Sequence, residues 1–136
     1  MSTPAIKVSS SSTFLRRVLA LDAAVTGGNG LIYLVAAGPV GRLLDVRSDL
    51  LTGLGIVLLA YGVAVGFLAA RPAPPSGWVR VVVVANVAWV AASLCALLFG
   101  WLDPSTAGMV WILLQAAVVA GFAALQAVGL NRRARG

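Results

Sequence analysis

The chain has 136 residues, enough for a single domain, and a formal net charge of +6. Hydrophobic residues make up 60% of it and charged residues only 10%, whereas about 25% of a typical soluble domain is charged. A soluble fold of this length cannot bury so much apolar surface, because small domains keep a large share of their surface in water. The composition therefore excludes an ordinary soluble domain and indicates a chain that faces lipid.

The basic residues gather at the ends of apolar runs, where they meet anionic lipid headgroups, and they form no stripe interleaved with exposed aromatic residues. We therefore expect the lipid bilayer, and not a nucleic acid, as a partner. Cys95 is the only cysteine and histidine is absent, so we expect no intramolecular disulfide, no metal and no cofactor. The sequence has no nucleotide-binding loop and no nucleophile beside a base, so we do not expect an enzyme.

In chain order, residues 1–13 are polar and serine-rich and are predicted to form a disordered cytoplasmic tail. Four apolar segments follow, each with at least the ~20 residues that a helix needs to cross a bilayer core. They cover residues 14–37, 49–70, 77–101 and 105–130. Because lipid offers the backbone no hydrogen-bond partners and no segment alternates in polarity, we expect four transmembrane helices and not a barrel. Residues 131–136 form a basic tail.

Three breaks separate the four spans. Gly38 and Pro39 are predicted to end the first helix, since proline disfavours helix at the residue before it. The following segment, 39–49, is compatible both with a short interfacial helix and with a plain loop. The segment 71–76 contains three prolines and interrupts any helix. Asp103 and Pro104 form a cap and a first turn for the last span.

The basic residues also predict the orientation of the chain. One side of the membrane receives eight of them: Lys7, Arg16, Arg17, Arg71, Arg80, Arg132, Arg133 and Arg135. The other side receives Arg42 and Arg47. The positive-inside rule then places both termini in the cytoplasm, for a multi-pass protein of the cell membrane. A cleaved signal peptide over residues 1–37 is the competing interpretation, which the length of the apolar stretch disfavours.

The two halves of the chain resemble each other. A shift of 64 residues aligns Asp22 with Asn86, and a shift of 55 residues aligns Gly53 with Gly108. Both halves begin on the same side of the membrane. The predicted fold is therefore an all-α bundle of four transmembrane helices, built as two parallel-repeat hairpins whose pseudo-axis lies along the membrane normal.

One face of the first span carries four polar residues at positions i, i+4, i+7 and i+11, namely Asp22, Thr26, Asn29 and Tyr33. A carboxylate inside a membrane costs roughly 2.5–3.5 kcal/mol on insertion scales and normally faces a bundle interior. Counted from their own ends, Asn86 and Gln126 reach the depth of Asp22. We therefore predict a polar intramembrane cluster. Its candidate members are Asp22, Thr26, Asn29, Tyr33, Asn86 and Gln126.

Two interpretations of Asp22 are open. In one, it is a polar clamp that ties helices together; in the other, it is a proton- or cation-responsive group in a transport path. The second span adds glycines that permit close helix contact, either within the monomer or with a partner. These are Gly53, Gly55, Gly62 and Gly66.

The segment 21–34, with 106–111 in support, resembles small four-helix integral membrane proteins of unknown function from high-GC actinobacteria. That resemblance implies a multi-pass membrane protein without an assigned activity. The expected function is association of helices, in a homo-oligomer or a larger membrane complex. The alternative is a small proton- or cation-coupled transporter that uses Asp22. Small multidrug-resistance transporters are similar in helix count and in a single carboxylate in the first helix, but this chain has a stronger charge bias and an aspartate instead of a glutamate.

Overall fold

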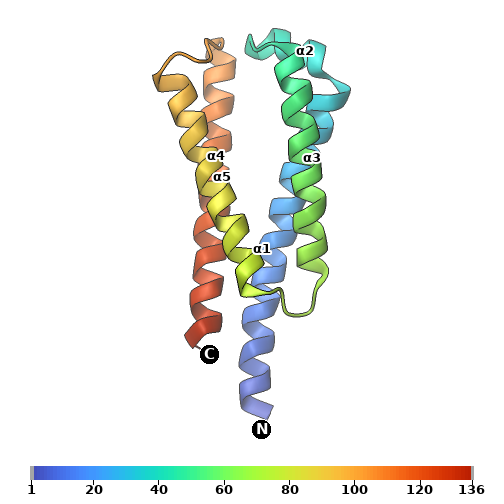
Figure 1. Cartoon of the computed structure of the whole chain (residues 1–136), viewed down its shortest axis with the longest axis vertical. Helices are drawn as coiled ribbons and strands as arrows, with labels where there is room; N and C mark the ends of the chain where they lie inside the picture. Colours follow the sequence, from blue (N-terminus) through green and yellow to red (C-terminus); the bar gives the residue numbers. More distant parts are fainter. Residues whose placement is uncertain (1, 136) are drawn as a thin grey trace.

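The computed structural model describes the backbone of residues 2–135 and the side chains of residues 12–134. Over this range the chain folds into five helices and no strand (Figure 1). They are α1 (Ser2–Val35), α2 (Ala37–Leu44), α3 (Ser48–Ala70), α4 (Ser76–Leu98) and α5 (Thr106–Arg135). Four of the helices in the described chain, all but α2, are long and apolar enough to cross a membrane. The predicted all-α bundle of four spans is confirmed.

The helices extend farther at both ends of the chain than the sequence predicts. α1 begins at Ser2, within the segment expected to be a disordered tail, and α5 runs to Arg135 through the expected basic tail. Extending an existing helix costs far less than starting one. Pro4 does not prevent the extension, because it lies in the first turn, where backbone N–H groups have no partner within the helix. The parts suited to a membrane are Ser12–Val35 and Thr106–Ala134.

The segment after the first span forms a short helix, which decides between the two alternatives for residues 39–49. α1 ends at Val35, and Pro39 falls in the first turn of α2 instead of directly ending α1. α2 ends at Leu44, and its C-cap residue Asp45 adopts a left-handed conformation with φ 54°. The main-chain N–H and the hydroxyl of Ser105 donate to the carbonyls of Leu44 and Leu43, at 3.0 and 2.9 Å. These bonds join the α4–α5 loop to α2.

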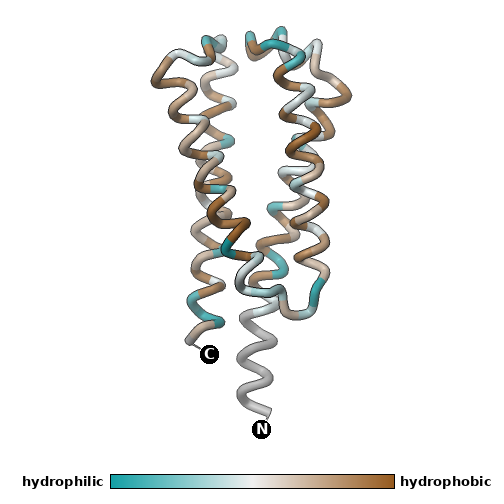
Figure 2. Tube along the Cα trace, in the orientation of Figure 1, coloured by the Kyte–Doolittle hydropathy of each residue, from teal (hydrophilic) through white to brown (hydrophobic). Residues whose placement is uncertain are grey.

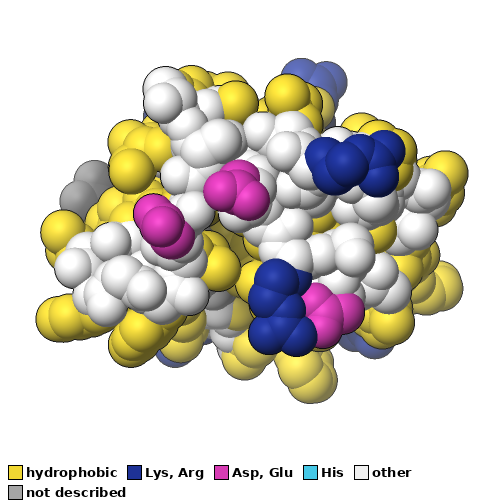
Figure 3. Space-filling view, turned by 90° about the horizontal axis from the view of Figure 1, so that it is seen from above, with side chains coloured by type: hydrophobic (Ala, Val, Ile, Leu, Met, Phe, Trp, Pro, Cys, Tyr) yellow, Lys and Arg dark blue, Asp and Glu magenta, His cyan; other side chains and the backbone are white. Residues whose placement is uncertain are grey.

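The spans form two hairpins, α1 with α3 and α4 with α5 (Figure 1). Both termini and the α3–α4 loop lie at one end of the bundle, which we call the basic end. The opposite end, called the α2 end, carries α2 and the α4–α5 loop. Hydrophobic residues dominate the length of the spans between these ends (Figure 2). The α2 end shows acidic and basic side chains close together (Figure 3), including the ion pair of Arg47 with Asp49.

The buried apolar side chains form two separate clusters. One lies toward the basic end and joins α1, α3 and α4 through Leu15, Leu19, Val65, Ala69, Val79 and Val82. The other lies toward the α2 end and is built on Tyr33, Leu51 and Leu58. Many large apolar side chains remain outside both clusters, such as Phe67 at 74% exposure. In a membrane these side chains contact lipid, so their exposure has no cost in free energy.

Glycines bring α1 and α3 into backbone contact. A Cβ at Gly62 would lie 2.7 Å from the Cα of Gly27, and a Cβ at Gly55 would lie 2.8 Å from the carbonyl oxygen of Gly30. A side chain at either site would therefore push the helices apart. Gly55 and Gly62 thus pack within the monomer, one of the two uses that the sequence left open. Gly53 has open space around it.

Candidate functional site

A hydrogen-bonded group of five side chains joins all four spans near the middle of the bundle. The carboxylate Oδ2 of Asp22 accepts from Asn86 Nδ2 at 3.0 Å and from Gln126 Nε2 at 2.7 Å. Its Oδ1 accepts from the Thr26 hydroxyl at 2.9 Å. The Tyr61 hydroxyl donates to Asn86 Oδ1 at 3.0 Å. We call these five residues the Asp22 network.

The helices position this network by simple spacing. Asp22 and Thr26 are one turn apart on α1, so their side chains stack on the same face. Asn86 occupies the position on α4 that the internal repeat aligns with Asp22, and the two side chains meet between the hairpins. Gln126 reaches the same point from α5. The structure thus brings together the three residues that the residue count places at the same depth, Asp22, Asn86 and Gln126.

Every polar atom of the Asp22 network has a partner of the right kind. Asn86 Nδ2 uses its second hydrogen on Gln126 Oε1 at 3.0 Å, and Asp22 is 1% exposed while Gln126 is 0% exposed. Among the described side chains, no buried nitrogen or oxygen atom is left without a hydrogen bond. The carboxylate is held by amide and hydroxyl donors and, in the described part of the chain, by no ion pair. This geometry is that of a clamp between helices.

Two predicted members of the cluster lie in a second layer, closer to the α2 end. The Tyr33 hydroxyl accepts from Trp111 Nε1 at 2.7 Å, which joins α1 to α5. Asn29 lies one turn from Tyr33, and Gln115 lies one turn from Trp111, in both cases toward the basic end. We call Asn29, Tyr33, Trp111 and Gln115 the Asn29 layer. The six predicted residues therefore divide between two sites instead of forming one.

Sequence reasoning missed Tyr61 and Trp111 as members of these layers. Tyr61 lies near the middle of the predicted span 49–70, and this position is the available signal in the sequence, but a single tyrosine in a span has no preferred partner. Trp111 lies near the end of its span, where tryptophan usually anchors a helix at the interface. Only the rotation of α3 and α5 about their axes shows that both side chains turn inward.

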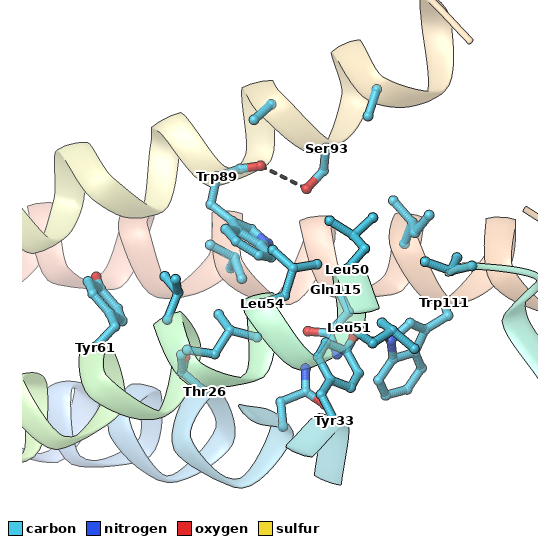
Figure 4. Close-up of a pocket in the computed structure, with 18 of the residues that line it drawn as sticks. Thr26, Tyr33, Leu50, Leu51, Leu54, Tyr61, Trp89, Ser93, Trp111 and Gln115 are labelled. Atoms are coloured by element: carbon cyan, nitrogen blue, oxygen red, sulfur yellow. Dashed lines mark hydrogen bonds between the residues drawn. The ribbon is translucent and has the colours of Figure 1, made fainter. Parts of the chain in front are cut away.

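A cavity of about 570 Å³ lies between the two hairpins, bounded by the Asp22 network on one side and by the α2 end on the other. All four spans line it (Figure 4). Thr26 and Tyr61 lie toward one end of the cavity, and Tyr33, Trp111 and Gln115 lie toward the other. Most of the lining is apolar, with Leu, Val and Ala side chains between a few polar groups.

Between α3 and α4 the cavity reaches the surface of the molecule. Near the basic end these two helices are joined by the first apolar cluster and by the bond from Tyr61 to Asn86. Toward the α2 end the two helices diverge (Figure 1). Residues of both helices line the cavity there. Leu50 and Val57 of α3 and Ala92 of α4 line the cavity and are exposed. In a membrane, this opening faces the acyl chains of lipid.

Arginine side chains link helices and loops at the basic end. Arg16 donates from Nε to the carbonyl of Ala69 at 3.0 Å, at the C-terminal end of α3. Arg133 donates to the carbonyl of Pro74 in the α3–α4 loop, so it links α5 to that loop. The guanidinium of Arg132 lies 5.1 Å from the ring centroid of Phe14. The side chains of Lys7 and Arg135 lie outside the described residues.

Comparison with protein families, curated proteins and solved structures finds no match for this chain.

Proposed function

We propose that this multi-pass membrane protein binds a small lipophilic molecule in the cavity between its two hairpins. The observation that supports this most directly is the cavity of about 570 Å³ itself. Ligand sites in proteins are concave, mostly apolar, roughly 300–1,000 Å³ in volume, and contain a few well-placed polar groups. The cavity has each of these properties. It lies between helices of a bundle, where such sites often occur.

The opening between α3 and α4 supports access from the bilayer. A lipophilic molecule concentrates in the hydrocarbon phase, and the opening faces that phase. The molecule can therefore reach the cavity without passing through water. We further propose that the basic end faces the cytoplasm, as the positive-inside rule favours, and that the protein resides in the cell membrane. The cavity then opens toward the outer half of the bilayer.

This proposal replaces two functions that the sequence favoured. Gly55 and Gly62 cannot contact a second protein in the way that association through α3 requires, because α1 of the same chain already packs against them. Proton- or cation-coupled transport requires Asp22 to meet the transported species. Asp22 does not line the cavity, and both of its carboxylate oxygens accept hydrogen bonds within the network. A clamp that holds the floor of a binding cavity accounts for these contacts better.

The proposal is testable by fluorescence, because Trp89, Trp101 and Trp111 line the cavity whereas Trp78 lies near the basic end. Bromine quenches tryptophan on contact, so bromonaphthol is a suitable probe. We expect saturable quenching when it is added to the protein in lipid nanodiscs. Replacing Ala92, which lines the cavity, with phenylalanine should fill the space and weaken binding by about tenfold, or ~1.4 kcal/mol.

Ala91→Phe is the matched control, since Ala91 is exposed on the same helix but does not line the cavity. Bromonaphthol should quench the tryptophan fluorescence of this variant as it does that of the wild type. If quenching rises linearly with the probe and is the same in all three proteins, the probe has only partitioned into lipid. That result would reject the proposed binding function.

A further inference from the structure

We infer that the cavity selects an uncharged lipophile whose hydrogen-bonding group docks on the side-chain amides of Asn29 and Gln115, and not at Asp22. The inference rests on the proposed function, because it specifies the chemistry of the ligand of that same cavity. It assigns the two polar layers different tasks. The Asp22 network holds the hairpins together, and the Asn29 layer recognises the ligand.

The charge of the ligand follows from the lining. Among the described residues that line the cavity, none is Asp, Glu, Lys or Arg. A charged ligand would lose its hydration in this apolar space and find no countercharge on the wall. The nearest candidate is the Asp22 carboxylate, which is 1% exposed and lies behind the side chains of Thr26 and Asn86. An uncharged molecule has no such cost.

The place of the polar contact follows from the hydrogen bonds already made. At the floor of the cavity, Thr26, Tyr61 and Asn86 all donate to acceptors within the protein. In the Asn29 layer, by contrast, the amides of Asn29 and Gln115 make no hydrogen bond to any other side chain or backbone group of the described chain. Each amide offers two donors and an acceptor to the cavity.

Unpaired amides in an apolar lining are unfavourable, because a polar group without a partner loses the hydrogen bonds that it makes in water. Asn29 on α1 and Gln115 on α5 lie on helices joined by the Tyr33–Trp111 bond, each one turn nearer the basic end than that bond. They are therefore at the same level of the cavity. A single carbonyl, amide or hydroxyl group of a ligand placed there can form a hydrogen bond with each of the two amides. Asp22 lies seven residues from Asn29, or ~10 Å along α1.

The remaining wall indicates the shape of the ligand. Aromatic side chains come from all four spans and from the α4–α5 loop: Tyr33, Tyr61, Trp89, Trp101, Trp111 and Phe122. Aromatic faces and edges pack best against flat or unsaturated groups. The ligand class is thus an uncharged, flat or unsaturated lipophile that carries a carbonyl, amide or hydroxyl group.

Four brominated probes with the same ring test the inference in nanodiscs: bromonaphthol, bromonaphthalene, bromonaphthylmethylamine and bromonaphthoate. Quenching is related to the probe concentration within the lipid, so that partitioning does not enter the comparison. We expect bromonaphthol to bind about fivefold more tightly than bromonaphthalene, the value of one net hydrogen bond. The ammonium and carboxylate probes should bind more weakly than bromonaphthol by a factor of about ten or more.

Asn29→Leu and Gln115→Leu should each reduce the preference for bromonaphthol over bromonaphthalene, because each removes one of the two amides that contact the ligand group. The double variant should reduce the preference to nearly onefold, while bromonaphthalene binds as before. Ser93→Ala is the control, because Ser93 lines the cavity but its hydroxyl already donates to the Trp89 carbonyl at 2.8 Å. It should keep the preference. The comparison of probes on the wild-type protein needs no variant, so it remains valid even if one variant misfolds.

The outcomes separate this inference from the proposed function. If the ammonium probe binds most tightly, or if bromonaphthalene binds as well as bromonaphthol, the cavity binds lipophiles but the inference is overturned. If no probe quenches in a saturable way, the proposed function fails, and the inference fails with it.

Discussion

The two hairpins have spans of similar length and contribute aligned polar residues, Asp22 and Asn86, but they are held together in different ways. In the first hairpin, α1 and α3 touch through backbone at Gly27 with Gly62 and at Gly30 with Gly55. In the second, a Cβ at Gly121 of α5 would meet no atom within 4 Å. Within an apolar stretch of 18 residues, 28% of residues are buried in α1 and in α3, against 11% in α4 and 17% in α5.

This difference explains where the cavity lies. Backbone contact makes the first hairpin a narrow, closely packed wall. The second hairpin contacts it through the Asp22 network, the apolar cluster at the basic end and the bond from Arg133 to the Ser12 hydroxyl. Toward the α2 end, α5 and the α4–α5 loop stay bonded to α1 and α2 through Trp111 and Ser105, while α4 diverges from α3. Aligned positions also differ in use: Gly53 is open, whereas its counterpart Gly108 packs against the carbonyl of Leu44. A sequence repeat therefore does not imply repeated packing.

The largest expected effect comes from separating the helices of the first hairpin. In Gly62→Leu the Cβ alone would lie 2.7 and 2.8 Å from backbone atoms of Gly27, which cannot move without shifting α1. We expect the free energy of unfolding, measured by SDS titration in mixed micelles, to fall by about 3 kcal/mol. Gly121→Leu on α5 is the control and should change it by no more than ~0.5 kcal/mol. Equal losses would mean that the hairpins are packed alike.

The next largest effect concerns the contact between hairpins at Asp22. In Asp22→Leu, the donors of Asn86 and Gln126 lose their shared acceptor inside the bundle, which should lower the free energy of unfolding by about 2 kcal/mol. Asp22→Asn keeps an oxygen for both amides and can donate its own amide to Thr26, so we expect a change within ~0.5 kcal/mol. A folded Asp22→Leu as stable as the wild type would exclude the clamp.

At the basic end, Arg133→Gln removes the contacts from α5 to the Pro74 carbonyl and the Ser76 hydroxyl. Hydrogen bonds from charged groups contribute about 1.5–3 kcal/mol when buried. This one is partly exposed, so we expect a loss of about 1 kcal/mol in the same titration. Arg80→Gln removes an exposed arginine from the same end and serves as the control. A similar loss in both variants would indicate an effect of net charge instead of a specific link.

The smallest expected effect concerns the Tyr33–Trp111 bond, which joins the two hairpins toward the α2 end. Trp111→Phe removes the donor to the Tyr33 hydroxyl and keeps an aromatic ring. Hydrogen bonds between membrane helices average ~0.6 kcal/mol, and we expect a loss of that size. Trp78→Phe, at a tryptophan that is 62% exposed, should leave the stability unchanged. If Trp111→Phe costs as much as Asp22→Leu, the hairpins are joined as firmly near the α2 end as at the Asp22 network.

The sequence predicted much of the site but not its division into two layers. Depth along a helix follows from counting residues, and this count placed Asn86 and Gln126 at the level of Asp22. It also put Asn29 and Tyr33 on the face of α1 that carries Asp22. The count does not reveal which groups are already paired, because pairing depends on side chains from other helices. Tyr61 and Trp111 were missed for that reason.

The number of spans, the breaks at 71–76 and at Asp103 and Pro104, and the presence of both termini at one end were determined by the sequence alone. These features depend on the free energy of each segment in lipid, which is a sum over neighbouring residues. The backbone contact in one hairpin, the cavity beside it and the unpaired amides of Asn29 and Gln115 were decided by the tertiary structure. They depend on how each helix is rotated and spaced against the others, and that is set by contacts between residues far apart in the chain.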